Sequence, residues 1–173
     1  EAQARRAAAA EQRRAHPADG PWSRGLSERC ITFGVPRLQA AYSSVFQIVQ
    51  SPNAVVFVME TIHDARIIPL DGTPHLPPGI PQWDGNSRGH WEGDTLVVDT
   101  TGFSPQSDMM GSSSGLHLVE RFTRIAPEKV RGSVAVDDTS TGTRPWTFSM
   151  PLTKNNNEPL MPYECHGGNC GLR

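Results

Sequence analysis

The feature that most constrains the fold is a glycine-first dipeptide between two runs of strand-forming residues. Gly93-Asp94 lies within the stretch from 88 to 103, which reads RGHWEGDTLVVDTTGF. A two-residue type II′ turn requires glycine at its first position, because that residue has a positive φ. Residues 88–93 and 94–100 are therefore predicted to form a tight hairpin. This hairpin indicates antiparallel β structure with short connections.

Other short runs of strand-forming residues follow one another from Val45 onward, separated mostly by turn residues. Strands are predicted over 45–50, 54–63, 66–70, 116–124, 129–136 and 145–150. Roughly eight short strands in this order favour an antiparallel barrel or sandwich over a βαβ sheet. We expect a mainly β fold, an antiparallel up-and-down barrel that is lipocalin-like in the broad sense. Such a barrel has room for a small ligand.

Two segments differ from this β pattern. Residues 1–15 are rich in Ala, Arg, Glu and Gln, and predict a helix that ends before His16-Pro17. We therefore divide the chain into a helical arm or linker over 1–25 and a β-barrel domain over 26–173. The proline-rich residues 74–81 are too long for a hairpin loop, and are predicted to lie across the surface or over a pocket.

Composition excludes several classes of partner. The formal net charge of −2 gives no electrostatic argument for binding nucleic acid. No apolar run approaches the roughly 20 residues of a membrane helix, so membrane insertion is not expected. A small molecule is the expected partner, and the oligomeric state is left open. Because the chain starts at Glu1 without an apolar signal region, we expect a processed or trimmed form.

Two glutamates are candidates for acid/base chemistry. Glu120 shares a strand face with Leu116, Leu118 and Phe122, and Glu60 shares one with Val56, Val58 and Ile62. If these apolar faces point inward, Glu60 and Glu120 are directed at the interior, where burial and mutual repulsion raise a carboxyl pKa. The alternatives are buried salt bridges to Arg66 and Arg121, or faces turned to water.

Histidines supply further candidates. His63, Asp64 and Arg66 fall within four residues, a trio that can orient a base or bind an anionic group, or can form an ordinary turn with a salt bridge. In an extended segment Glu164 and His166 share one face, and with His63 or His117 they could hold a single divalent metal. The alternative is that neighbouring groups satisfy these histidines, so the expected cofactor is none or one divalent metal.

The three cysteines allow several pairings. A Cys30–Cys165 disulfide would join the two ends of the chain, whereas Cys165–Cys170 would close a small glycine-rich loop. Three unconnected thiols are the third alternative.

Several motifs resemble those of a group of secreted bacterial proteins that has no assigned activity. They are LSERCI (26–31), IHDARIIPLDG (62–72), WEGDTLVVDTT (91–101), LHLVERFT (116–123) and TRPWT (143–147). The resemblance spans roughly residues 26–169 and implies an exported protein of which this chain is the C-terminal part, but no reaction. An exported location favours the Cys30–Cys165 pairing. Residues 165–170 read CHGGNC where the group resembles CHEGNY, so a glutamate of that motif is missing.

We therefore expect a secreted or periplasmic enzyme that performs acid/base hydrolysis or elimination on a small organic or sugar-derived substrate. His63 and His117 would be the acid and base, with Glu60 or Glu120 orienting one of them. The residues expected to contact the substrate are Asp64, Arg66, Arg121, Trp91 and, at the pocket rim, His166. The alternatives are a non-catalytic carrier of a small hydrophobic ligand and a structural domain of a larger exported protein.

Overall fold

The computed structural model describes residues 2–17, 19–36, 45–107, 109–112, 114–163 and 165. Within them, one α-helix and two single helical turns accompany eight strands. The helical elements are α1 (Ala2–Ala15), η1 (Pro21–Ser23) and η3 (Thr61–His63). The strands are β1 (Phe46–Gln50), β2 (Ala54–Met59), β3 (Ala65–Pro69), β4 (Asn86–Glu92), β5 (Thr95–Thr101), β6 (His117–Ala126), β7 (Lys129–Asp137) and β8 (Trp146–Thr153).

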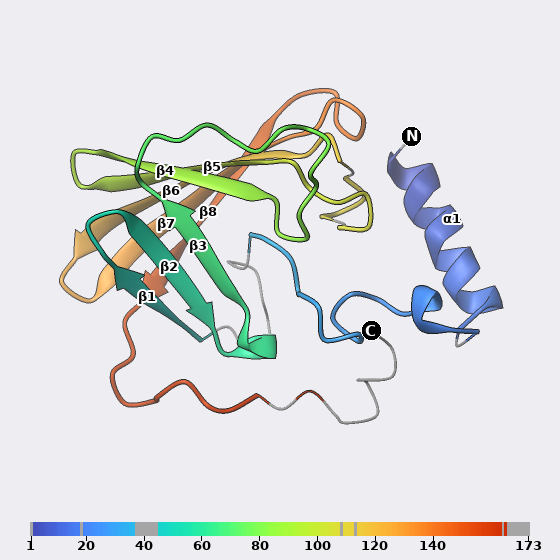
Figure 1. The fold of residues 1–173 in the computed structure, drawn as a ribbon, viewed down its shortest axis with the longest axis horizontal. Coiled ribbons are helices and arrows are strands. Elements are labelled where there is room, and N and C mark those ends of the chain that lie inside the picture. The colour runs from blue at the N-terminus through green and yellow to red at the C-terminus, as the bar shows by residue number, and fades with distance from the viewer. Residues whose placement is uncertain are drawn as a thin grey trace.

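The strands form two antiparallel sheets in which sequential strands are neighbours. The first sheet has the order β1-β2-β3 and the second the order β4-β5-β6-β7-β8. Figure 1 shows the three-stranded sheet in front of the five-stranded one, with α1 standing to one side. Phe57 of β2 and Phe122 of β6 make an edge-to-face contact, with 5.0 Å between ring centroids. The two sheets therefore share one core, and the predictions of a mainly β protein and an N-terminal helix are confirmed.

The hairpin predicted from Gly93-Asp94 is present. In the β4–β5 ladder Glu92 is paired with Thr95, so the loop has only two residues. Gly93 has a φ of 57°, and Asp94 is not among the described residues with a positive φ. This combination is what a type II′ turn requires.

The second predicted strand, over 54–63, ends earlier than expected. β2 stops at Met59, whose N–H donates to the carbonyl of Asp64 across a four-residue loop. Val55, Phe57 and Met59 form the buried face of β2, so its inward face has the parity opposite to that of Glu60. Both faces of this segment are apolar, and alternation alone therefore could not select the inward one. Glu60 lies half-buried in the loop instead of on the interior face.

A buried ion pair connects the two sheets. Arg66 of β3 is 7% exposed and Glu120 of β6 is 1% exposed, and an Nη2–H of Arg66 donates to Glu120 Oε2. Arg66 also donates to Ser87 Oγ of β4 at 2.9 Å and to Thr100 Oγ1 of β5 at 2.7 Å. One side chain of the first sheet thus binds three strands of the second.

The close approach of the two sheets depends on a glycine. A Cβ at Gly89 of β4 would lie 2.7 Å from Ile68 Cγ2 and 2.8 Å from Leu70 Cδ2. Such distances are shorter than real Cβ atoms tolerate, so any larger residue at this position would separate β3 from β4.

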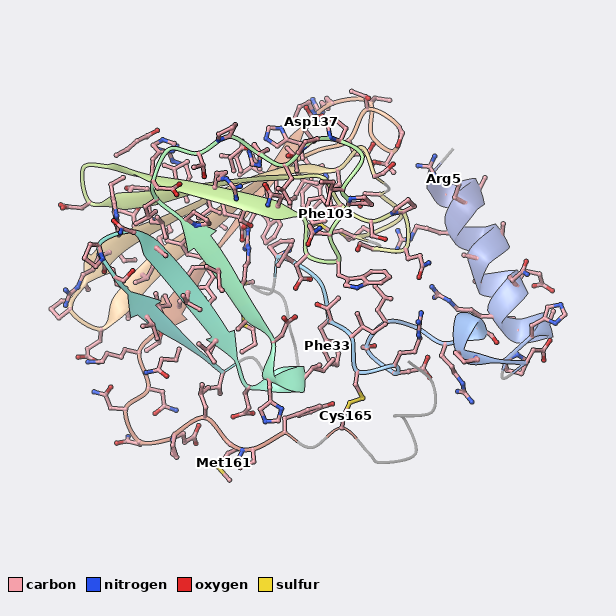
Figure 2. The ribbon with its side chains drawn as sticks, viewed as in Figure 1. Arg5, Phe33, Phe103, Asp137, Met161 and Cys165 are labelled. Atoms are coloured by element: carbon pink, nitrogen blue, oxygen red, sulfur yellow. A yellow bond between two sulfur atoms is a disulfide. The ribbon has the colours of Figure 1, made fainter. Side chains whose placement is uncertain are left out.

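A disulfide joins the segment after α1 to the C-terminal segment. Cys30 and Cys165 are bonded across 135 residues of chain, which agrees with one of the three alternatives left by the sequence. Figure 2 shows the sulfur–sulfur bond beside the label of Cys165. Among the described residues, no helix combines the length and the apolar character needed to cross a membrane.

Replacement of Glu120 by alanine is expected to destabilise the protein strongly. The Glu120→Ala change leaves the Arg66 guanidinium buried without its carboxylate, a situation that costs about 3–5 kcal/mol. Urea denaturation followed by circular dichroism measures the loss. The matched control is Glu92→Ala, which removes the exposed carboxylate paired with Arg121 and should barely move the urea midpoint. Equal effects of the two variants would contradict the role assigned to the buried pair.

Candidate functional site

Two carboxyl groups meet at the same hydroxyl. Asp64 lies between η3 and β3, and Asp84 lies just before β4. Thr32 Oγ1 is 2.7 Å from Asp64 Oδ2 and 2.7 Å from Asp84 Oδ1. Thr32 is buried and the two aspartates are half-buried. We refer to Asp64 and Asp84 as the aspartate pair.

The hydrogen bonds at Thr32 suit a pair that carries one proton, as it does below the pKa of Asp84, which is about 6. A hydroxyl group donates one hydrogen bond and accepts up to two. The backbone N–H of Gly34 donates to Thr32 Oγ1 at 2.8 Å and occupies one acceptor position. Two ionised carboxylates would compete for the single hydroxyl hydrogen. With one proton on the pair, Thr32 donates to the carboxylate and accepts from the carboxylic acid, so every contact is satisfied.

The electrostatics of Asp84 agree with this count of protons. Burial raises the pKa of Asp84 to about 6, and the neighbouring charge of Asp64 acts in the same direction. The hydrogen bond from Thr32 and the positive charge of Arg66 lower this pKa in part. A carboxyl group that titrates near pH 6 can give up or take a proton under mild conditions, as general acid/base catalysis requires.

The loop before Asp64 has an unusual backbone. Ile62 and His63 both have positive φ values, of 62° and 54°. A β-branched residue is rarely found in this conformation, and each such residue costs on the order of 1–3 kcal/mol. Backbone strain of this kind persists only where the surroundings impose it, and it is found frequently at active sites.

Glu60 and His63, both predicted site residues, hold the C-terminal segment. Glu60 Oε2 accepts a hydrogen bond from the Met161 N–H at 3.0 Å, and His63 Nε2 accepts one from the Tyr163 N–H at 3.2 Å. His63 is exposed, one residue from the aspartate pair. Figure 2 shows Met161 on the segment that passes below the three-stranded sheet.

His117 belongs to a different group of side chains. Its Nε2 lies 2.7 Å from Asp99 Oδ2, and His75 Nε2 lies 2.8 Å from Asp99 Oδ1. His75 comes from the proline-rich segment, and Arg88 donates to the carbonyls of Thr73 and Pro74 in the same segment. The segment therefore lies across the sheet as expected. His117 binds Asp99 whereas His63 binds the Tyr163 N–H, so these contacts do not bring the two predicted acid/base histidines together.

The predicted substrate-binding residues are dispersed. Arg66 forms an ion pair with Glu120 in the core. This pair is one of the salt bridges considered from the sequence. Arg121 pairs with Glu92 on the surface instead of with Glu120, and this pairing, followed by a hydrogen bond from His90, lowers the pKa of Glu92. Trp91 is 44% exposed and lines a cleft.

The residues predicted to hold a metal are not all among those that the structure describes. In the part of the chain that the structure describes, no three His, Cys, Asp or Glu side chains are grouped so that they could hold a metal ion. His166 and Glu164, the residues named for such a site, lie outside the described residues.

Two clefts adjoin the core. The first, of about 780 Å³, is mainly apolar and lies between the β1–β2 hairpin and the β4–β5 and β6–β7 turns. We call it the apolar cleft. The second, of about 960 Å³, lies between the helical arm and the sheets. Its wall includes Thr32 and the exposed aromatic side chains of Phe33, which is next to Thr32 in sequence, and Trp83, which is next to Asp84. We call it the arm cleft.

The sequence did not identify Thr32 or Asp84 as site residues. Asp84 stands in Trp83-Asp84-Gly85, which is ordinary turn chemistry. Thr32 lies 52 residues earlier, in a segment without regular secondary structure. No spacing rule connects such positions, whereas Asp64 was found because it follows a histidine and precedes an arginine.

Comparison with protein-family models, with curated proteins and with solved structures finds no match to this chain. The resemblance to secreted bacterial proteins rests on the motifs alone, and the function is argued from the residues described above.

The aspartate pair predicts a specific pH dependence of stability. The pKa of Asp84 is about 6 in the folded protein, above its ordinary value of 3.8, so the folded state binds this proton more tightly than the unfolded chain. Protonation of Asp84 therefore stabilises the fold, and this contribution is lost as the pH rises from about 4 through about 6. The stability of an Asp84→Asn variant, which is never ionised, should therefore rise relative to that of the wild type by about 2 kcal/mol between pH 4.5 and pH 7.5.

Urea denaturation of both proteins at the two pH values measures this gain. In Asp64→Asn the neighbouring negative charge is gone, so the transition should move to lower pH. A wild-type to Asp84→Asn difference that is the same at both pH values would contradict the assignment.

Proposed function

We propose that this protein is an acid/base enzyme whose proton-transfer group is the aspartate pair, acting on a small organic or sugar-derived molecule by hydrolysis or elimination. The observation that carries the proposal is the convergence of Asp64 and Asp84 on Thr32 Oγ1 at 2.7 Å each. A carboxylate and a carboxylic acid side by side supply a base and an acid at once. The group differs from the acid and base expected from the sequence, His63 and His117 with Glu60 or Glu120 orienting one of them, but the proposed class of reaction is the same.

The protons balance in either reaction. In hydrolysis, the carboxylate takes a proton from water, the water oxygen bonds to the substrate carbon, and the carboxylic acid gives its proton to the leaving oxygen. In elimination, the carboxylate takes a proton from carbon, the electron pair forms a double bond, and the acid protonates the leaving oxygen. One proton enters the pair and one leaves it, so the pair again carries one proton, now on the carboxyl group that acted as the base.

The arm cleft is the proposed route for the substrate: Thr32 lines it, whereas Asp64 and Asp84 are not among its lining residues. Phe33 and Trp83 are 47% and 39% exposed, although both are large apolar residues. Each is adjacent in sequence to a member of the Thr32 and Asp84 contact, and both line the arm cleft. Aromatic faces of this kind suit the flat or apolar face of a ring.

The two sheets are best interpreted as an up-and-down barrel, lipocalin-like in the broad sense, that is open between sheets. The support is the sequential strand order, together with the Arg66 contacts between β3 and β4–β6. An open barrel leaves space for ligands beside the shared core.

A secreted or periplasmic location is part of the proposal. The Cys30–Cys165 disulfide supports it, because disulfides persist in oxidising compartments and are rare in the cytosol.

A carrier of a small hydrophobic ligand is the second candidate function. The apolar cleft supports it, because ligand pockets are concave, mostly apolar and roughly 300–1,000 Å³ in volume. The lining residues of this cleft include no member of the aspartate pair, so the two functions can be tested separately.

The enzyme proposal is tested with a panel of nitrophenyl esters, lactones, epoxides and nitrophenyl glycosides. Turnover of a substrate from this panel should fall by at least about 100-fold in Asp64→Asn and in Asp84→Asn, the usual range for loss of a general acid or base. In the wild type, kcat should decline above about pH 6, where the pair loses its proton.

Two comparisons sharpen this test. Glu92→Gln, an exposed carboxylate outside the site, should retain full activity. His117→Ala probes the His75–Asp99–His117 group on the sheet surface. Loss of activity in His117→Ala but not in Asp84→Asn would move the acid/base group to that surface. Absence of turnover with the entire panel, combined with ligand retention, would favour the carrier.

A further inference from the structure

We infer that the apolar cleft binds one uncharged apolar molecule that contains a ring and has a single polar group at its outer end. The inference deepens the carrier candidate and rests on it, because it names the ligand of that cleft. It is independent of the aspartate pair.

The cleft is lined by both exposed and buried apolar residues, which we call its rim and its floor. Ile48, Trp91 and Ile125 form much of the rim and are 43–44% exposed. The floor residues are Val55, Phe57, Leu96 and Phe122, which are 1–6% exposed. A protein partner or a second copy of the chain would cover only the rim. A small molecule can reach the floor, which is why we assign the cleft to a small ligand.

Charge at the cleft favours an uncharged ligand. Asp94, in the β4–β5 turn, and Arg124, in β6, are the charged residues of the lining, and their formal charges cancel. Arg124 would attract an anionic ligand and Asp94 would repel it. A cationic ligand would be attracted by Asp94 and repelled by Arg124. Neither sign of charge therefore gains, whereas a buried ionic group loses its hydration. Gln50 at the same lining can donate to or accept from one polar group of the ligand.

Aromatic side chains make a ring the preferred body of the ligand. Trp91 stands at the rim, and the edge-to-face pair of Phe57 and Phe122 lies at the floor. Aromatic rings gain additional stabilisation from edge-to-face or offset contacts with other rings. The aliphatic side chains between them, from Ile48, Ile125 and Val130, suit an apolar body without hydrogen-bonding groups.

A matched pair of fluorescent probes tests the inference. N-phenyl-1-naphthylamine is uncharged, and 8-anilino-1-naphthalenesulfonate carries the same rings with an added sulfonate. The full chain should bind about one N-phenyl-1-naphthylamine per molecule, at least about tenfold more tightly than the sulfonate. Equal or tighter binding of the sulfonate would overturn the inference, as would no binding of either probe.

Two charge variants locate the probe. Asp94→Asn leaves Arg124 unbalanced and should tighten sulfonate binding up to about fivefold, whereas Arg124→Gln should weaken it by a similar factor. Binding of N-phenyl-1-naphthylamine should change less than about twofold in both variants. If neither variant alters sulfonate binding, the probe occupies another place and the inference fails.

A charged residue at the rim supplies the remaining control. Ile48→Glu should weaken N-phenyl-1-naphthylamine binding at least about tenfold. Ile67→Glu is matched to it, because Ile67 is 64% exposed and lies outside the cleft, and should bind the probe like the wild type. Both positions are exposed, so both variants should fold, which circular dichroism checks. Equal weakening in the two variants would overturn the inference. The inference would also be overturned if the chain dimerised through the cleft and the dimer did not bind the probe. Size-exclusion chromatography detects such a dimer.

Discussion

The rest of the structure depends on the ion pair between Arg66 and Glu120. Neither charge could stay in the core alone, because an unpaired buried ion is far more costly than an exposed one. The pair therefore fixes where β3 lies on the second sheet. Ser87 and Thr100 add hydrogen bonds from β4 and β5 to the same guanidinium. A slip of one residue in any of these strands would turn its polar group to the opposite face.

The same guanidinium connects the core to the aspartate pair. Arg66 lies two residues after Asp64, and its positive charge opposes the rise in the pKa of Asp84. Thr32, which bridges them, is two residues from Cys30 of the disulfide. The position of the bridging hydroxyl is thus set by a covalent bond to the C-terminal segment. The C-terminal segment in turn binds the loop of Glu60 and His63 that precedes Asp64.

The sequence predicted those parts of the fold in which the residue pattern is compatible with only one local structure. In β6, Leu118, Glu120 and Phe122 were grouped on one face from the sequence, and the structure buries all three. The Gly93-Asp94 turn was equally decisive. β2 is apolar on both faces, so nothing in its sequence showed that the strand ends at Met59, and Glu60 was assigned to the interior as a result. Asp84 was not predictable, because its role arises only when an irregular segment brings Thr32 to it.

The aspartate pair and the apolar cleft lie near opposite ends of β4. Asp84 lies just before β4, whereas Trp91 of the cleft lies near the end of β4 and Gly93 lies just after it. Seven residues of β-strand span roughly 20 Å, longer than most small ligands. A molecule seated in the cleft therefore does not place its reactive atoms at the pair. If both sites bind ligands as proposed, the ligand of the cleft is a second molecule, and β4, which Arg66 binds through Ser87, is the element that the two sites share.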